Sequence, residues 1–253
     1  MIKKGILGVI KKMGYEVYKP NPLYNEKGYP VDLDKDFIHL YEQTKSYTMT
    51  SIERMNSAFN AVEYILKANV IGDIVECGVW RGGSSMIMAL QLMRFKNSER
   101  NMFLYDTFEG MSVPIEGEKS LFGKDAMEEW KKTQTESVNE WCYAPIEDVQ
   151  KNLYSTGYPK DKFHFIKGKV EDTIPENLPK AISILRLDTD WYESTYHELV
   201  HLFPLLSKNG VLIIDDYGHW EGARGAVDKY IKENNIHILL NRIDYTGRIG
   251  IKI

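Results

Sequence analysis

The chain has 253 residues, of which 43% are hydrophobic and 27% are charged, so it can form a full core and is not an intrinsically disordered protein. Its 32 lysines and arginines against 36 aspartates and glutamates give a net charge of −4, which argues against nucleic acid as the main partner. The two cysteines, Cys77 and Cys142, exclude a disulfide framework and a cysteine metal cluster, and they favour a reducing, cytoplasmic compartment.

The N-terminal segment contains an apolar stretch that is too short for a signal sequence or a membrane span. Residues 6–10 form this stretch between two pairs of lysines, whereas a secretory signal needs about 7–15 apolar residues and a spanning helix about 18 or more. We expect a short amphipathic helix that packs on the protein body, with contact to a membrane surface as the weaker alternative. Residues 20–36 read as a connector. Residues 1–46 are therefore expected to be an N-terminal extension or lid.

From residue 47 onward, helical and strand patterns alternate along the chain. Helical spacing of apolar side chains predicts helices over residues 52–66, 86–93, 192–206 and 221–233. Short apolar runs predict strands over residues 73–78, 101–106, 163–167, 183–187 and 211–214. Such alternation predicts an α/β fold in which helices cover both faces of a parallel sheet.

Two segments depart from this alternation. Residues 236–243 and 248–253 alternate polar and apolar side chains around residues 244–247, which predicts an antiparallel β-hairpin at the end of the sheet. Residues 111–145 form a long polar interruption with several aromatic side chains, and loops of this length are usually lids or binding loops. We therefore expect one domain over residues 47–253 with a lid inserted around 111–145.

A glycine-rich turn lies between the first predicted strand and the helix that follows it. Gly78, Gly82 and Gly83 allow a tight turn, close approach of the backbone to a ligand, and helix amides that face an anion. Trp80 stands where a dinucleotide-binding fingerprint has its second glycine. This spacing argues against a pyrophosphate and favours a ligand with a small carboxylate and an ammonium group.

Asp106 ends the next predicted strand, where an acid commonly binds the two hydroxyl groups of a ribose. Together with the glycine turn, it favours a cofactor that contains a ribose. Glu76, within the preceding strand, has two equally supported interpretations. It either helps to hold the ligand or is a carboxylate satisfied within the protein.

Two later strands both end in carboxylates. Asp188 closes one strand and Asp215 and Asp216 close the next, and a helix between them places both strand ends side by side. Three converging carboxylates repel one another unless a cation lies between them, and a set of oxygen ligands suits Mg²⁺. The alternative is that Asp215 or Asp216 caps the next segment or pairs with Arg186 or Arg224.

A fourth carboxylate, Asp190, lies two residues beyond Asp188. A carboxylate near a metal-bound hydroxyl group is a suitable proton acceptor, because the metal lowers the pKa of that hydroxyl. His219, which follows the second pair of aspartates, and His201 are the rival candidates for a general base.

The motifs that carry these residues resemble those of the macrocin O-methyltransferase family, the TylF group. The resemblance covers residues 47 to the C-terminus, and its carriers are YTMTSIERM at 47–55, ECGVWRGGSS at 76–85, YDTFEGM at 105–111, KGKVEDTIP at 167–175, LRLDTDWYESTYHEL at 185–199 and GVLIIDDYG at 210–218. Members of this family are S-adenosylmethionine- and Mg²⁺-dependent enzymes that methylate sugar hydroxyl groups of natural products.

The resemblance implies a Rossmann-like class I methyltransferase fold with a mostly parallel, seven-stranded sheet. It implies that the ribose of S-adenosylmethionine binds at Asp106, the methionine end near Glu76 and the turn at Gly78, and the adenine near residues 170–172. The cofactor-binding residues expected from it are Glu76, Gly78, Trp80, Gly82, Ser84, Asp106, Thr107, Val170, Asp172 and Asp188. The expected metal ligands are Asp188, Asp215 and Asp216, with Asp190 as the general base.

The preferred hypothesis is a Mg²⁺-dependent O-methyltransferase that moves a methyl group from S-adenosylmethionine to a hydroxyl of a sugar or glycoside. The alternatives are a catechol-like acceptor, a nicotinamide-dependent oxidoreductase, and a nonenzymatic binding module on the same fold. The expected partner is a small-molecule acceptor, without nucleic acid and without a transmembrane segment. The sequence leaves the oligomeric state open, with a homodimer as one option.

Overall fold

The computed structural model describes Met13 and residues 22–253. The chain divides into two units, Met1–Ile38 and His39–Ile253, and the whole sheet belongs to the second. The amphipathic helix expected around residues 6–10 lies outside the described residues. Residues 22–34 form turns with one isolated bridge between Tyr24 and Pro30, and helix α2 (Lys35–Thr44) follows them.

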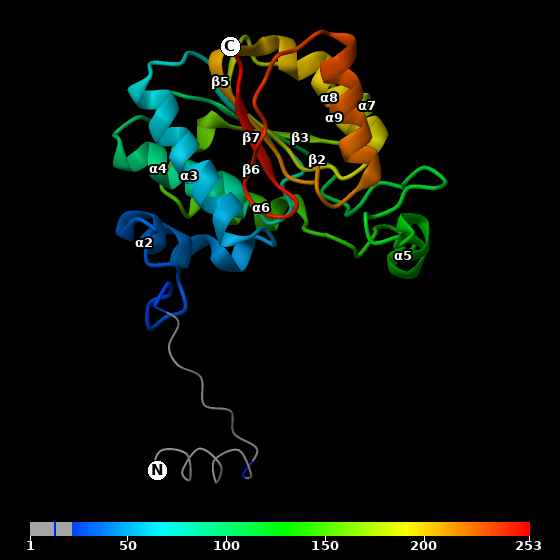
Figure 1. Ribbon diagram of the computed structural model, residues 1–253, viewed down its shortest axis with the longest axis horizontal. Helices are drawn as coiled ribbons and strands as arrows, with labels where there is room; N and C mark the ends of the chain where they lie inside the picture. The colour runs from blue at the N-terminus through cyan, green and yellow to red at the C-terminus, as the bar shows by residue number, and fades with distance from the viewer. Residues whose placement is uncertain (1–12, 14–21) are drawn as a thin grey trace, which may run out of the picture. The chain divides into compact units, whose positions relative to one another are not determined.

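A seven-stranded sheet forms the centre of the second unit (Figure 1). Its strands are β1 (Asp73–Cys77), β2 (Met102–Asp106), β3 (Phe163–Lys167), β4 (Ile182–Leu187), β5 (Leu206–Ile214), β6 (Asn241–Arg242) and β7 (Arg248–Ile251). They lie in the order β3-β2-β1-β4-β5-β7-β6. Strands β1 to β5 are parallel, and β7 is antiparallel to both β5 and β6. The predicted α/β fold, with a mostly parallel sheet that ends in a hairpin, is confirmed.

Helices cover both faces of this sheet. The helices of the second unit are α3 (Ile52–Lys67), α4 (Gly83–Arg94), α5 (Ala126–Thr133), α6 (Ile146–Tyr154), α7 (Val170–Thr173), α8 (Tyr192–Leu202) and α9 (Glu221–Glu233), with short 3-10 turns at Lys45–Tyr47, Lys160–Lys162 and Phe203–Leu205, and α5 lies away from the sheet (Figure 1). Helices α3 and α4 pack together on one face, and α8 and α9 pack together on the other (Figure 1). Because both faces are covered, all six residues of β4 are buried.

The structure differs from the predicted elements at two of the strands. Strand β5 begins at Leu206 instead of residue 211. Leu206 pairs with Ile182, and the polar residues 207–209 fall at an irregularity of the ladder, so the apolar pattern does not reveal this part of the strand. The first arm of the hairpin is only Asn241–Arg242 long. The apolar side chains that predicted a longer arm, Ile236, Ile238 and Leu240, pack against the core without forming a ladder.

Helix α6 was not among the predicted elements. It is nine residues long, starts after Pro145, and buries Val149 and Leu153. Proline cannot donate a backbone hydrogen bond and therefore suits the start of a helix. The segment is too short for its periodicity to stand out in the sequence.

The register of the sheet brings the predicted site residues to one edge. Cys77 is paired with Tyr105 and with Leu187, and Leu187 is paired with Ile214, so these four strands all end at the same level. The residues that follow them are therefore neighbours in space. This edge is the carboxyl end of the parallel strands, where α/β proteins bind their ligands.

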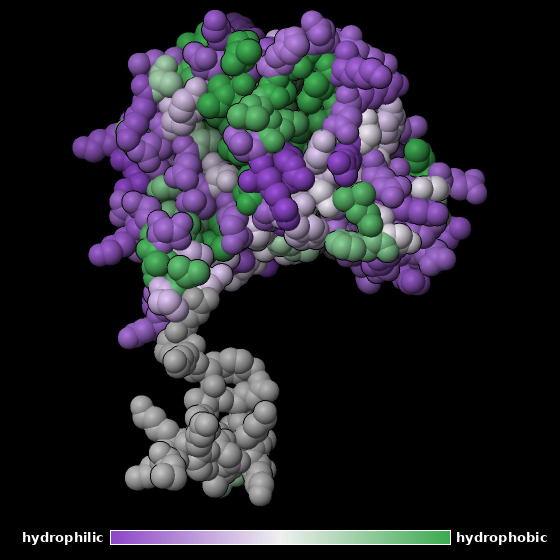
Figure 2. Space-filling model, viewed as in Figure 1, coloured by the Kyte–Doolittle hydropathy of each residue, from purple (hydrophilic) through white to green (hydrophobic). Residues whose placement is uncertain are grey.

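The surface of the second unit is mostly polar, with an apolar area beside the C-terminus (Figure 2). Leu239, Ile251 and Ile253 are exposed on the hairpin side of the sheet. Among the helices of the described residues, none combines the length and the apolar character needed to cross a membrane.

Candidate active site

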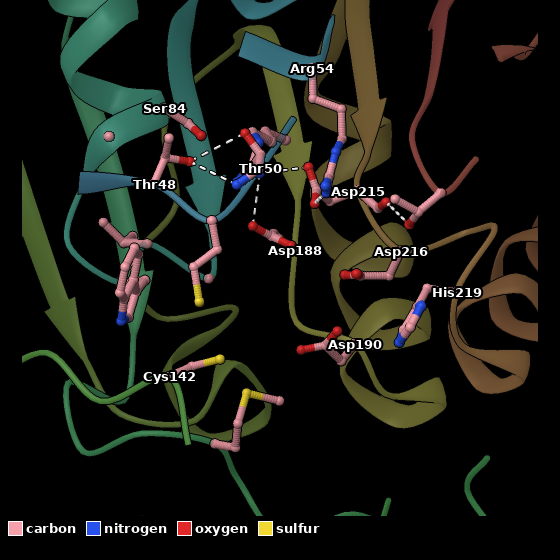
Figure 3. Close-up of a pocket in the computed structure, with 18 of the residues that line it drawn as sticks. Thr48, Thr50, Arg54, Ser84, Cys142, Asp188, Asp190, Asp215, Asp216 and His219 are labelled. Atoms are coloured by element: carbon pink, nitrogen blue, oxygen red, sulfur yellow. Dashed lines mark hydrogen bonds and ion pairs between the residues drawn. The ribbon is translucent and has the colours of Figure 1, made fainter. Parts of the chain in front are cut away.

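A cavity of about 310 Å³ opens at the carboxyl edge of the sheet (Figure 3). Its walls come from the turns after β1, β4 and β5, the end of β2, the start of α3, the hairpin and the predicted lid. The predicted site residues that line it are Gly78, Trp80, Ser84, Asp106, Asp188, Asp190, Asp215 and Asp216. The fold therefore brings the predicted cofactor, metal and base residues into one space.

A second cavity of about 60 Å³ lies beside the first and shares Gly78, Asp106 and Asp188 with it. Thr107 and Val170, which the resemblance assigns to the cofactor, line this smaller space. The two neighbouring cavities are thus lined by seven of the ten expected cofactor residues.

The other expected cofactor residues lie outside both cavities. Glu76 is 1% exposed, and its carboxylate accepts a hydrogen bond from Ser85 and pairs with Arg186. Gly82 is the residue before helix α4 and has a φ of +89°, so it shapes the turn through its backbone. Asp172 is exposed and lines a separate hollow. Glu76 therefore fits the second interpretation of the sequence, a carboxylate satisfied within the protein.

Gly78 is the point where the turns after β1 and β4 meet. Its φ is +80°, and an added Cβ atom would lie 2.6 Å from the carbonyl carbon of Asp188. Such a distance is closer than real contacts allow, and residues with a side chain rarely adopt this φ. Glycine is thus required here by the close approach of two backbone segments.

Asp106 orders the same turn from the end of β2. Its Oδ2 accepts hydrogen bonds from the backbone N–H groups of Val79 (2.7 Å) and Trp80 (3.0 Å), and its Oδ1 accepts one from Phe108 (2.6 Å). Burial raises the pKa of Asp106, while these amides oppose the rise. The residue expected to bind a ribose therefore also fixes the glycine turn, a role that the sequence did not indicate.

Arg186 joins the carboxylates of three strands. It is 3% exposed and is the penultimate residue of β4. Its Nη1 donates to Glu76 Oε1 (2.7 Å), and its Nη2 lies 2.8 Å from Asp188 Oδ2 and 2.6 Å from Asp215 Oδ1. The pairing of Asp215 with Arg186, which the sequence left as an alternative, is therefore present. Arg224 instead faces Asp228.

Arg54, near the start of α3, is a site residue that the sequence reasoning missed. It pairs with Asp215 Oδ2, and its Nε lies 3.0 Å from Asp244 Oδ2 in the hairpin. Its only signal in the sequence is its place within the motif at residues 47–55. Together, Arg54 and Arg186 engage both oxygens of Asp215.

The three predicted metal ligands form a compact set of oxygens. One carboxylate oxygen from each of Asp188, Asp215 and Asp216 lies within 4.8 Å of the others. Asp216 Oδ2 is buried and has no hydrogen-bond partner among the residues that the structure describes. Burial raises the pKa of Asp188 to about 6, with Arg186 opposing the rise and Asp216 adding to it. Carboxylates in this situation are suited to a cation.

Asp190 lies in the turn after β4, with a φ of +67°, and faces the cavity from the side of Asp216 (Figure 3). Burial and the charge of Asp188 raise its pKa to about 7, while hydrogen bonds with the side chains of Asp216 and Trp220 oppose the rise. The backbone has therefore left the strand at this point. The carboxylate leans over the cavity instead of extending the strand.

The comparisons with known proteins agree with this geometry. A model of the macrocin-O-methyltransferase (TylF) family matches residues 11–249. The chain belongs to the macrocin O-methyltransferase family. It is thus an S-adenosylmethionine-dependent O-methyltransferase, and the nicotinamide-dependent oxidoreductase is excluded.

Curated relatives and a solved structure support the same assignment. The 8-demethyl-8-(2,3-dimethoxy-alpha-L-rhamnosyl)-tetracenomycin-C 4'-O-methyltransferase of Streptomyces olivaceus is 34% identical over 202 residues, which are 80% of this chain and 74% of the relative. The mycinamicin III 3''-O-methyltransferase of Micromonospora griseorubida is 29% identical over 81% of this chain and 78% of the relative. The structure of the O-methyltransferase NovP matches with a TM-score of 0.71 and 30% identity, over 81% of this chain and 82% of that one.

In this methyltransferase, both rival histidines can be located. His219 lines the cavity, and its Nδ1 lies 3.1 Å from the hydroxyl of Tyr245. Burial lowers its pKa, and the charges of Arg54 and Lys124 lower it further. His201 lies in α8 beside His197 and does not line the cavity. Only Asp190 and His219 therefore share the cavity as candidate bases of the predicted set.

The segment predicted as a lid contributes one wall of the methyltransferase cavity. Met111, Trp141 and Cys142 line it. The ring of Trp141 packs against Trp191 (5.7 Å between ring centroids) and Trp220 (6.0 Å), which belong to the turns after β4 and β5. These aromatic contacts connect the lid with the turns that carry the carboxylates.

Proposed function

We propose that this enzyme transfers the methyl group of S-adenosylmethionine to a hydroxyl of a sugar or glycoside and that it requires Mg²⁺. The observation that carries the proposal is the convergence of Asp188, Asp215 and Asp216 in the same cavity as the glycine turn. The names of the relatives add to it, because they describe O-methyltransferases for a rhamnosyl-tetracenomycin and for mycinamicin III.

The donor set fits a hard divalent cation. Its ligands are carboxylate oxygens, the type that Mg²⁺ prefers, and the buried Oδ2 of Asp216 still needs a partner. Arg54 and Arg186 already balance Asp215, and Arg186 also pairs with Asp188, so the cation mainly meets the charge of Asp216 and shares Asp188 with Arg186. Mg²⁺ held there supplies a positive charge that lowers the pKa of the acceptor hydroxyl.

The cofactor site uses the backbone more than charged side chains. We assign its methionine end to the turn from Gly78 to Ser84, where the first amides of α4 begin, and its ribose to Asp106. Thr107 and Val170 line the smaller cavity, which suits the adenine. When it is bound, S-adenosylmethionine supplies the reactive methyl group, and these residues align it.

Asp190 is assigned as the general base. With a pKa of about 7, its ionised form is populated at neutral pH, so a carboxylate oxygen can accept the proton of the acceptor hydroxyl. Trp141, Trp220 and Met111 form an apolar wall on the lid side of the cavity. Aromatic walls of this kind exclude water and suit the C–H faces of a sugar ring.

The deciding experiment measures methyl transfer with and without Mg²⁺. The acceptors are methyl α-L-rhamnoside, methyl β-D-glucoside and catechol, and the enzyme is stripped with a chelator before Mg²⁺ is returned. We expect turnover of a glycoside that the chelator abolishes and Mg²⁺ restores, with binding of S-adenosylhomocysteine largely unchanged. Faster turnover of catechol would reassign the acceptor. Full activity with the metal content verified as nil would reduce the three aspartates to a structural feature.

A further inference from the structure

Glu118 is a lid residue whose carboxylate lies between the starts of two helices. It is 5% exposed. Burial raises the pKa of this carboxyl group, and the backbone N–H of Tyr192, the first residue of α8, opposes the rise. Its Oε1 is buried and has no hydrogen-bond partner among the described residues. On the other side it contacts Gly222, the second residue of α9, where an added Cβ atom would lie 2.5 Å from the Glu118 carboxyl carbon. The glycine therefore leaves the space that the carboxylate occupies.

The two helices lack an acceptor of their own at this end. The residues that precede them, Trp191 and Trp220, make no capping hydrogen bond through their side chains. The first turn of a helix carries unpaired N–H groups and a partial positive charge, which a carboxylate stabilises. The carboxylate of Glu118 faces the start of α8 and lies against the same part of α9.

These helix starts follow directly on the turns that carry the catalytic carboxylates. Tyr192 is two residues beyond Asp190, and Gly222 is six residues beyond Asp216. A displacement of either helix start therefore moves the turn before it. Glu118 is thus in a position to hold both turns, although it does not line the cavity itself.

The lid on either side of Glu118 is bound to the same two turns through the backbone. The N–H of Glu221 donates to the carbonyl of Lys119 (3.0 Å), and the N–H of Leu121 donates to the carbonyl of His219 (2.7 Å). The indole of Trp191 donates to the carbonyl of Ser112 (3.1 Å). The carboxylate of Glu118 is therefore one part of a continuous attachment of the lid.

We propose that Glu118 is a positioning residue for methyl transfer. Its carboxylate, seated between α8 and α9, fixes the lid over the cavity and holds the turns that carry Asp190 and Asp216. The effect on those two residues rests on the proposed function, in which they act as base and metal ligand. The attachment of the lid does not depend on it.

The experiment is a double-mutant cycle on Glu118 and Gly222. Glu118→Ala should lower kcat for methyl α-L-rhamnoside about 10- to 100-fold, the scale expected when reacting groups are displaced by about 1 Å. The dissociation constant of S-adenosylhomocysteine should stay within about twofold. Gly222→Ala should cause a similar loss, because the new Cβ occupies the place of the carboxylate.

The double variant distinguishes this proposal from two independent defects. With Glu118 already removed, the alanine at 222 meets no carboxylate, so the double variant should be no slower than Glu118→Ala alone. Its Tm should be at least as high, since alanine is the better helix former. Glu118→Gln should recover most of the activity, because the amide oxygen can accept from Tyr192. The control is Glu116→Ala, which removes an exposed carboxylate of the same lid and should change nothing.

A second readout does not require turnover. Trypsin should cut the lid of Glu118→Ala and of Gly222→Ala faster than the wild-type lid at Lys119 and Lys124, and the double variant should match the single ones. Loss of Tm with unchanged kcat, or losses that multiply in the double variant, would overturn the positioning role. If trypsin reveals the coupling but Asp190→Asn remains fully active, the proposed function fails and the lid attachment stands.

Discussion

The cofactor half and the acidic half of the active site are built on the same sheet edge by different means. Around β1 and β2, the site consists of a glycine turn and backbone amides, with Asp106 as the single carboxylate that orders them. Around β4 and β5, it consists of aspartates balanced by Arg54 and Arg186. The first half depends on backbone conformation, so added atoms should damage it. The second half depends on charge balance, so changes that keep the shape should be enough to disable it.

The two halves touch at two points. The backbone of Gly78 packs against that of Asp188, and Arg186 joins Glu76 of β1 to Asp188 and Asp215. A change at either point should therefore affect both the cofactor and the metal. Changes elsewhere should affect the binding of either the cofactor or the metal, but not both.

The largest effect is expected from Asp190→Asn in the acidic half. The change keeps the shape but removes the proton acceptor, so kcat should fall by about 10²–10⁴-fold. Binding of S-adenosylhomocysteine and Mg²⁺ should persist, because a group that acts in the transition state contributes little to ground-state binding. Steady-state kinetics measures kcat, and calorimetry measures the binding of S-adenosylhomocysteine and Mg²⁺. The residual rate should rise with pH as solvent hydroxide takes over.

The control for this prediction is His219→Ala, which removes the rival base from the same cavity. It should cost far less than Asp190→Asn. If His219→Ala is the inactive variant and Asp190→Asn is nearly normal, the two roles are reversed.

Gly78→Ala tests the contact between the halves. The new Cβ would overlap the backbone of Asp188, and the φ of +80° is strained for alanine. We expect a lower Tm and weaker binding of both S-adenosylhomocysteine and Mg²⁺, measured by calorimetry. Gly157→Ala is the control, because Gly157 has a similar φ of +76° but open space around it. Loss of only one ligand in Gly78→Ala would show that the halves are independent.

Asp106→Ala should affect the cofactor half alone. It removes the acceptor for the amides of Val79 and Trp80 and the group assigned to the ribose. Binding of S-adenosylhomocysteine should weaken by more than about 1.5 kcal/mol, since charge-assisted hydrogen bonds are lost. The affinity for Mg²⁺ should be nearly unchanged. Unchanged cofactor affinity would remove Asp106 from the cofactor site.

Much of the fold was predictable because the apolar pattern records which side chains are buried. The limits of α9, Glu221–Glu233, match the predicted helix, and β3, Phe163–Lys167, matches the predicted strand. The start of β5 was not predictable in this way, because the polar residues Ser207, Lys208 and Asn209 interrupt the apolar run after Leu206, and the backbone N–H of Asn209 donates to the carbonyl of Lys252. Hydrogen bonds of the backbone leave no mark on composition.

The candidate site shows the same division. Asp188, Asp215 and Asp216 could be placed together because parallel strands end at a common edge, a rule that needs only the order of elements. Arg54 and Glu118 could not, since each acts on a partner far along the chain. Arg54 and Asp215 are 161 positions apart, and only the folded structure brings them into contact.

Glu198 is a further buried acid of the acidic half, and it sharpens the comparison because no arginine in the described part of the chain balances it. It lies in α8 and is fully buried. Its Oε1 accepts a hydrogen bond from the hydroxyl of Thr189 (2.9 Å), and its Oε2 has no partner among the described residues. Burial raises its pKa well above the ordinary value of 4.5, with the Thr189 hydroxyl opposing the rise. Asp215, in contrast, is held by two arginines.

The smallest effect is therefore expected from Glu198→Gln, and it should depend on pH. The folded protein keeps this acid protonated, whereas the unfolded chain ionises it above about pH 4.5, so wild-type stability falls as pH rises through that value. Glutamine does not ionise, so this dependence of stability on pH is removed, and its amide oxygen can still accept a hydrogen bond from the hydroxyl of Thr189. The Tm of the variant should equal that of the wild type near pH 4 and exceed it at pH 8, by about 2–4 °C for each kcal/mol relieved. Glu193→Gln, an exposed change in the same helix, should show no such trend. A variant that is less stable than the wild type at pH 8 would mean that Glu198 is ionised in the folded protein and is balanced by a charge after all.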